Sequence, residues 1–281
     1  MHSVTSKDGS RIAYDRYGEG PAVILVGGAL SHRKFNKMEQ LAELLAGRCT
    51  VINYDRRGRG DSTEAGPFAL EREIEDIQAL IDAAGGRASL WGWSSGGALA
   101  LRAARVLSGV ERVAVYEPPF MVTPGAERPT PDYGRRLDEL VAAGDRGGAV
   151  RHFMRNAIGI PAPFVALMRL MPMWKAMKAN AHTLPYDWAA LGEHTMYGAP
   201  LDPREWAAVT VPALVAYGAK SPATLQRGAR SLAEVLPTAE LRELPGVGHN
   251  VKMKVLAPVL ADFLVQGGDR RGDAQASLAA A

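Results

Sequence analysis

Cysteine is nearly absent from this chain of 281 residues, and with one cysteine an internal disulfide is excluded. The single residue, Cys49, precedes the apolar Val51 and Ile52, so we expect it to be a small buried hydrophobic residue, as in a reducing cytoplasm. Residues 1–9 have no apolar signal core, and no hydrophobic run reaches membrane-spanning length. The sequence therefore predicts a cytoplasmic protein that is neither secreted nor inserted in a membrane.

An excess of charge of one sign is missing too, because 33 basic and 30 acidic residues leave a net charge of +3. The densest basic run, residues 56–59, is short and contains a glycine, which favours a solvated or internally paired loop over a nucleic-acid-binding face. Asp55 and Asp61 flank this run, and we expect them to pair with it.

Patterns that hold metals or nucleotides are also missing. The chain contains no H-x-x-x-H or C-x-x-C spacing, and its glycines at 27–28 and 92–97 do not follow G-x-G-x-x-G. We therefore expect neither a metal nor a dinucleotide cofactor.

Most of the chain alternates apolar runs with helical segments, which is typical of a parallel sheet covered by helices on both faces. We predict an α/β fold with a mostly parallel central sheet of about eight strands. Two extended pieces flank the turn at residues 8–9, and further strands are expected at 22–26, 50–54, 88–91, 112–116, 213–217 and 240–244. Helices are expected at about 34–46, 70–84, 95–107 and 223–236, with a last helix ending near 265.

The alternation stops between about residues 118 and 203, where prolines punctuate helical stretches. We expect a helical lid inserted after the sixth strand. The predicted division is a core at 1–119 and 201–266, a lid at 120–200 and a disordered tail at 267–281.

Apolar side chains are frequent in this inserted segment, and seven of the ten methionines lie between Met121 and Met196. We expect most of these side chains to form the lid's own core and a few to face a cavity that adapts to apolar ligands. The set comprises Phe164, Leu167, Met168, Met171, Met173, Trp174 and Met177.

The most informative motif is G-x-S-x-G at residues 92–96, between an apolar strand and a helix-forming run. Glycines at 92 and 96 remove Cβ atoms that would collide in a sharp strand-to-helix turn. Such a turn exposes the Ser94 hydroxyl and points the Ser95 N–H to where negative charge would develop. Ser94 is thus the predicted nucleophile, and Ser95 a predicted donor of an oxyanion hole.

A serine hydroxyl needs a base within hydrogen-bonding reach, and imidazole titrates in the useful range. His249 lies on a glycine-rich loop directly after a strand, at the sheet edge where Ser94 is expected. It is therefore the predicted base. Of the other histidines, His2 lies at the N-terminus and His32 follows the third strand, where its ring could line the pocket. The remaining three fall in the lid segment: His152, His182 and His194.

Three further stretches resemble the α/β-hydrolase superfamily, in particular its esterase- and haloperoxidase-like members with a helical lid. Residues 54–62 are similar to the D-x-R-G-x-G-x-S loop after the fourth strand, and residues 246–249 resemble the G-x-x-H that presents the catalytic histidine. Residues 26–29 stand where members usually carry His-Gly, with Gly27 in place of the histidine. The resemblance runs from about residue 6 to 265, and it implies hydrolytic chemistry with a second oxyanion donor at Ala29.

The third member of a triad is where the chain departs from this pattern. Members usually carry G-x-x-D after the seventh strand, but residues 218–221 read Gly-Ala-Lys-Ser, and serine cannot stabilise an imidazolium by charge. Glu117 ends the sixth strand at the same edge, a position from which some members supply the acid, so it is the main candidate. Asp187 in the lid is a weaker candidate and fits a helix cap better. A Ser–His dyad also stays open.

These residues predict a cofactor-independent serine hydrolase that cleaves an ester, lactone or thioester of a largely apolar small molecule through an acyl-enzyme on Ser94. Two alternatives remain. One is a non-hydrolytic biosynthetic enzyme, such as a lyase, cyclase or acyl transferase, with His249 as its acid and base. The other is a small-ligand-binding protein on the same scaffold.

Overall fold

The computed structural model describes residues 1–35, 37–123, 129–192 and 198–265. Within these ranges eight strands form one sheet in the order β1-β2-β4-β3-β5-β6-β7-β8. The pairs β1–β2 and β2–β4 are antiparallel and the other pairs are parallel, so the predicted, mostly parallel sheet is confirmed. The strands are β1 (His2–Thr5), β2 (Arg11–Tyr17), β3 (Ala22–Val26), β4 (Thr50–Tyr54), β5 (Ala88–Trp93), β6 (Val110–Tyr116), β7 (Ala213–Gly218) and β8 (Ala239–Leu244).

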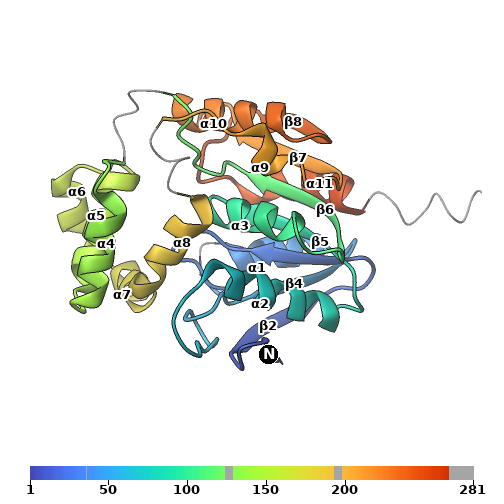
Figure 1. The fold of residues 1–281 in the computed structure, drawn as a ribbon, viewed down its shortest axis with the longest axis horizontal. Coiled ribbons are helices and arrows are strands. Elements are labelled where there is room, and N and C mark those ends of the chain that lie inside the picture. The colour runs from blue at the N-terminus through green and yellow to red at the C-terminus, as the bar shows by residue number, and fades with distance from the viewer. Residues whose placement is uncertain (36, 124–128, 193–197, 266–281) are drawn as a thin grey trace, which may run out of the picture.

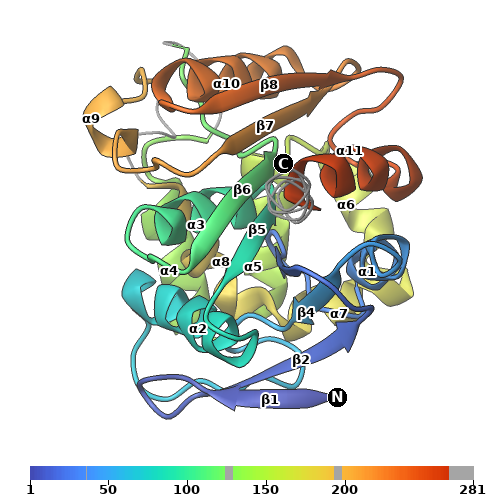
Figure 2. The same ribbon diagram turned by 90° about the vertical axis from the view of Figure 1, so that its right-hand side faces the viewer.

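Helices cover both faces of the sheet (Figures 1 and 2). Alternate residues of β3 show why its sequence is a continuous apolar run: Val23 and Leu25 join one hydrophobic cluster, whereas Ile24 and Val26 join the other. The first cluster includes α1 (Met38–Leu45) and α11 (Met253–Val265), and Cys49 is buried there as expected. The second includes α2 (Leu70–Ala83), α3 (Ser95–Ala104), α10 (Ala223–Val235) and Trp206 of α9 (Pro203–Trp206).

Two helices are shorter than the sequence predicts. The helix expected from residue 34 begins at Met38, because Lys37 before it has a left-handed backbone with φ of 63°. The helix expected to reach residue 107 ends at Ala104. After Ala104 the chain forms separate turns, in which the N–H groups of Val106 and Leu107 donate to the Ala103 carbonyl.

The helices between β6 and β7 confirm the lid expected after the sixth strand. Most of them stand to one side of the sheet in Figure 1, and α8 joins this group to the core by packing on α3. The exact lid limits, 120 and 200, stay a prediction, and the tail proposed at 267–281 lies outside the described residues. The lid helices are α4 (Tyr133–Ala142), α5 (Arg146–His152), α6 (Ala162–Met168), α7 (Pro172–Ala179) and α8 (Leu184–Leu191), with a π-helical turn at Phe153–Ala157 and a 3₁₀ turn at Ala181–Thr183.

The lid has a hydrophobic cluster of its own, in which Trp174, Met177, Met154 and Val165 are buried. Leu30, from the loop after β3, is buried in the same cluster and so connects the lid to the core. In the ranges that the structure describes, no helix combines the length and apolarity needed to cross a membrane.

Candidate active site

Ser94 occupies the sharp turn between β5 and α3. Its φ of 56° and ψ of −129° are strained for a residue with a side chain, and such strain is common at functional sites. The glycines beside it are required by space: a Cβ on Gly92 would lie 2.4 Å from the Gly96 carbonyl oxygen, and one on Gly96 would lie 2.2 Å from the Val26 carbonyl oxygen. The motif thus adopts the turn that its sequence predicts.

The loop after β3 lies directly against this turn. A Cβ on Gly28 would lie 2.8 Å from the Trp93 carbonyl oxygen and 3.2 Å from the Ser94 Cβ, so only glycine permits this approach. Ala29, the next residue, lines the same cavity as Ser94 and Ser95. Ser95 is the first residue of α3, where backbone N–H groups have no partner within the helix.

Glu117 and His249 meet beside Ser94. The Glu117 Oε2 lies 2.7 Å from His249 Nδ1, and its Oε1 accepts a hydrogen bond of 2.7 Å from the Gly218 N–H. The Glu117 side chain is fully buried and its backbone has a φ of 47°, which is a second strained position at the sheet edge. A buried carboxylate beside Nδ1 favours the tautomer that carries its proton on Nδ1, in which the Nε2 lone pair is free to accept a proton.

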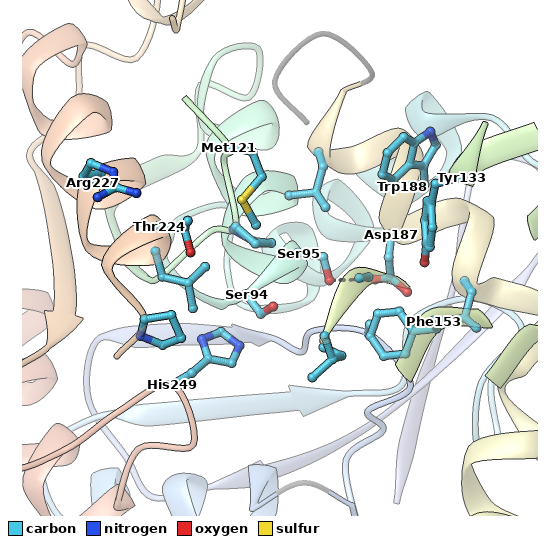
Figure 3. Close-up of a pocket in the computed structure, with 18 of the residues that line it drawn as sticks. Ser94, Ser95, Met121, Tyr133, Phe153, Asp187, Trp188, Thr224, Arg227 and His249 are labelled. Atoms are coloured by element: carbon cyan, nitrogen blue, oxygen red, sulfur yellow. Dashed lines mark hydrogen bonds between the residues drawn. The ribbon is translucent and has the colours of Figure 1, made fainter. Parts of the chain in front are cut away.

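The His249 loop is held by residues of the neighbouring strands. The Tyr116 hydroxyl donates to the Gly248 carbonyl at 2.8 Å, and the Trp93 indole N–H donates to the His249 carbonyl at 3.3 Å. The ring itself lines the cavity and its side chain is 32% exposed (Figure 3). The strands that carry Ser94 and Glu117 therefore also position the histidine.

Asp187, the second candidate for the acid, lies elsewhere in the site. Its carboxylate accepts hydrogen bonds from Arg56, Arg59 and the Ser95 hydroxyl. Burial alone would raise the pKa of Asp187, but the charges of Arg59 and Arg56 and their hydrogen bonds outweigh it and lower the pKa. The expectation of a helix cap is wrong, because the N-cap of α8 is Thr183 and the Asp187 carboxylate is bonded to the two arginines instead.

The arginine-rich loop is internally paired, but not by the aspartates that flank it. Arg56 donates two bonds of 2.6 Å to Glu73 of α2, and Arg57 bonds Asp76 of the same helix. Asp55 and Asp61 instead contact Arg33, and Asp55 also accepts from the Asp61 N–H at 2.8 Å. The Asp55 carboxylate thus accepts backbone N–H groups of Arg33 and Asp61, and the side chains of Arg56 and Arg57 bond to α2.

The cavity at this site has a volume of about 560 Å³, within the range of small-molecule sites. It lies between the core and the lid, and Figure 3 shows Ser94 and His249 on one side with Phe153, Tyr133 and Trp188 on another. Near α10 the lining is more polar and includes Thr224 and Arg227.

The apolar lid residues singled out from the sequence do not line this cavity. Trp174 and Met177 are buried in the lid cluster, whereas Phe164, Leu167 and Met171 are exposed. The lining comes instead from α4, the π-helical turn and α8, whose short and irregular segments show no clear apolar period in the sequence. Over the described ranges, no group of three or more His, Cys, Asp or Glu side chains is arranged to hold a metal ion.

Comparison with known proteins identifies the family and the fold of the chain. The profile of the alpha/beta hydrolase family matches residues 22–259. An alpha/beta hydrolase from Sphaerobacter thermophilus is 47% identical, with a TM-score of 0.85 over 93% of this chain and 99% of that one. The enol-lactonase from Burkholderia xenovorans shares the fold at 20% identity, with a TM-score of 0.66 over 94% of this chain and 100% of its own.

A similar sequence also occurs within a much larger protein. The polyketide synthase ThaQ from Burkholderia thailandensis is 28% identical over 272 residues. That match covers 91% of this chain but 12% of the synthase, so the chain spans about one eighth of the length of that relative.

Proposed function

This chain belongs to the alpha/beta hydrolase family, and from that premise we propose that it is a serine hydrolase acting through an acyl-enzyme on Ser94. Its substrate would be an ester, lactone or thioester of a largely apolar small molecule. The contact of 2.7 Å between His249 Nδ1 and the buried Glu117, in a site whose cavity is lined by Ser94, carries this proposal.

In the proposed mechanism, His249 Nε2 takes the Ser94 proton as Ser94 Oγ attacks the carbonyl carbon of the substrate. The negative charge that develops on the carbonyl oxygen is stabilised by the N–H groups of Ala29 and Ser95. His249 then donates its proton to the leaving oxygen or sulfur, and the acyl group stays on Ser94. A water that loses a proton to Nε2 attacks the acyl-enzyme, and His249 returns this proton to Ser94 Oγ as the bond between Oγ and the acyl carbon breaks and the acid leaves.

The lining of the cavity supports an apolar acyl or alcohol part. Phe153, Ile158, Leu184 and Leu191 from the lid face this space, and each methylene group buried there contributes about 0.8 kcal/mol to binding. Since the chain resembles a segment of a polyketide synthase, acyl chains of the kind such a synthase builds belong in the substrate panel.

The test combines turnover of p-nitrophenyl esters with labelling by a fluorophosphonate, which reacts with activated serines. We expect both activities in the parent protein and neither in Ser94→Ala. Turnover that persists without labelling of Ser94 would favour acid–base chemistry by His249 alone. A protein inert in both assays would favour the ligand-binding alternative.

A further inference from the structure

We propose that Asp187 is a positioning residue that fastens the lid to both donors of the oxyanion hole. The inference rests on the hydrolase function proposed above. In it, the Asp187 carboxylate aligns two backbone N–H groups, those of Ser95 and Ala29.

Asp187 is a buried residue of α8 with three donors around its carboxylate. Its Oδ1 accepts from Arg56 Nη1 at 2.6 Å and from Ser95 Oγ at 2.9 Å, and its Oδ2 accepts from Arg59 Nη2 at 2.7 Å. The bond to Ser95 is the dashed line in Figure 3. The lid is thus bonded directly to the residue whose N–H is one proposed donor.

The two arginines extend this contact to the other donor. Arg59 Nη1 donates to the Gly28 carbonyl at 2.8 Å, and Arg56 Nη1 donates to the Gly27 carbonyl at 3.2 Å. The Gly28 carbonyl and the Ala29 N–H belong to one planar peptide unit, so a hydrogen bond that fixes the carbonyl also fixes the direction of the N–H. Asp187 therefore reaches Ala29 through Arg59, and Ser95 through its hydroxyl.

The arginines depend on Asp187 to different degrees. Arg56 keeps its two bonds to Glu73 if Asp187 is lost. Arg59 is fully buried, and within the described residues Asp187 is its one acidic partner. Replacing Asp187 by a neutral residue would leave a buried guanidinium held by carbonyl and hydroxyl groups alone, and such a charge tends to move or to admit water. The Gly28 carbonyl also accepts from the Ser31 hydroxyl at 2.6 Å and from the Ser31 N–H at 3.2 Å, so losing the Arg59 bond would loosen the alignment of the Gly28 peptide without freeing it.

A second buried pair provides a matched control. Arg57 bonds Asp76 at 2.7 and 2.9 Å, and both side chains are as deeply buried as those of the Asp187 cluster. The contacts of Arg57 reach Asp8 and the Arg72 carbonyl, and they involve neither residues 27–29 nor the lid. Asp76→Asn thus removes a buried charge pair without touching the oxyanion hole.

The experiment compares Asp187→Asn and Asp76→Asn in the full chain with a p-nitrophenyl ester. For Asp187→Asn we expect kcat to fall roughly 10- to 100-fold, less than the loss of a whole oxyanion donor, while KM changes less than about threefold. For Asp76→Asn we expect a lower Tm with kcat within about twofold of the parent. Full kcat in folded Asp187→Asn, with only a lower Tm, would overturn the proposal.

A transition-state analogue separates alignment from stability. A trifluoromethyl ketone forms a hemiketal with Ser94, and its oxyanion occupies the hole, so its Ki should rise by the same factor as kcat/KM falls. An unchanged Ki in Asp187→Asn would also overturn the proposal. If Asp187→Asn does not fold, Ser95→Ala keeps the N–H and removes the hydroxyl, and it should raise this Ki by about 3- to 10-fold. A parent protein without turnover or labelling would refute the proposed function itself, whereas an active parent with unaltered variants refutes only the role of Asp187.

Discussion

Glu117 and His249 are 132 positions apart in the chain, and their side chains meet at 2.7 Å. The sheet makes this contact, because β6 ends at Tyr116 and its carboxyl end lies at the same edge as the loop after β8. Ser221, at the position where the family usually has an aspartate, is buried, and the contact to the imidazole comes from Glu117. In this chain the carboxylate beside the imidazole therefore comes from the end of β6.

Glu117→Gln tests this relationship. The amide keeps the size of the side chain but removes the charge that would stabilise the imidazolium, and its N–H₂ group can impose the wrong tautomer on His249. We expect kcat to fall by orders of magnitude, about 10⁴-fold in the comparable aspartate-to-asparagine change of a serine protease. Ser221→Ala should leave kcat nearly unchanged. A glutamine variant with near-normal kcat would leave a Ser–His dyad as the explanation.

Ser94→Ala tests the nucleophile itself. The hydroxyl provides chemistry and little packing, so kcat for an aryl ester should fall by roughly three or more orders of magnitude while Tm stays close to that of the parent. Turnover within tenfold of the parent, measured under the same conditions, would contradict the assignment of Ser94.

Local motifs made part of the site predictable from the sequence. The turn at Ser94 requires Gly92 and Gly96 at fixed spacing, and a histidine that follows a strand directly must lie at the sheet edge. The position of Glu117 was predictable for the same reason, because parallel strands end at one edge of the sheet. These inferences need only short segments and the direction of the strands.

Contacts between distant segments were beyond such reasoning. Asp187 bonds Ser95, Arg59 and Arg56 across 92, 128 and 131 positions, and no local pattern in the sequence indicates contacts over such separations. The sequence did not predict which lid residues line the cavity, because the short lid helices carry apolar side chains on both their buried and their exposed faces. Phe153 and Phe164 differ in burial, but nothing in their neighbouring residues separates them.

These two phenylalanines provide a test of the cavity. The value of kcat/KM should rise up to about fourfold for each methylene from acetyl to hexanoyl esters, since a buried CH₂ contributes about 0.8 kcal/mol. Phe153→Ala enlarges the cavity and should weaken this dependence, whereas Phe164→Ala, at a side chain that is 62% exposed, should not. Equal rates for all esters in the parent would argue for an open or polar site.

We expect Arg227 of α10 to make activity depend on the charge of the substrate. Its side chain lines the cavity and its Nε donates to Thr123 Oγ1 at 3.0 Å. A substrate with a terminal carboxylate would find this cation at the α10 side of the pocket (Figure 3).

Because Arg227 is exposed, the expected gain is that of a surface ion pair, at most about 1 kcal/mol or roughly fivefold in kcat/KM. Arg227→Gln should remove the preference for a carboxylate-terminated ester over a methyl-terminated ester of equal length, and added salt should reduce the preference in the parent. Arg230 lies on the same helix, but its guanidinium faces the Tyr217 ring at 4.8 Å, pairs with Glu243 at 3.5 Å and does not line the cavity, so Arg230→Gln is the control. If both variants lower the preference equally, the effect belongs to the general charge of α10, and Arg227 does not select the substrate.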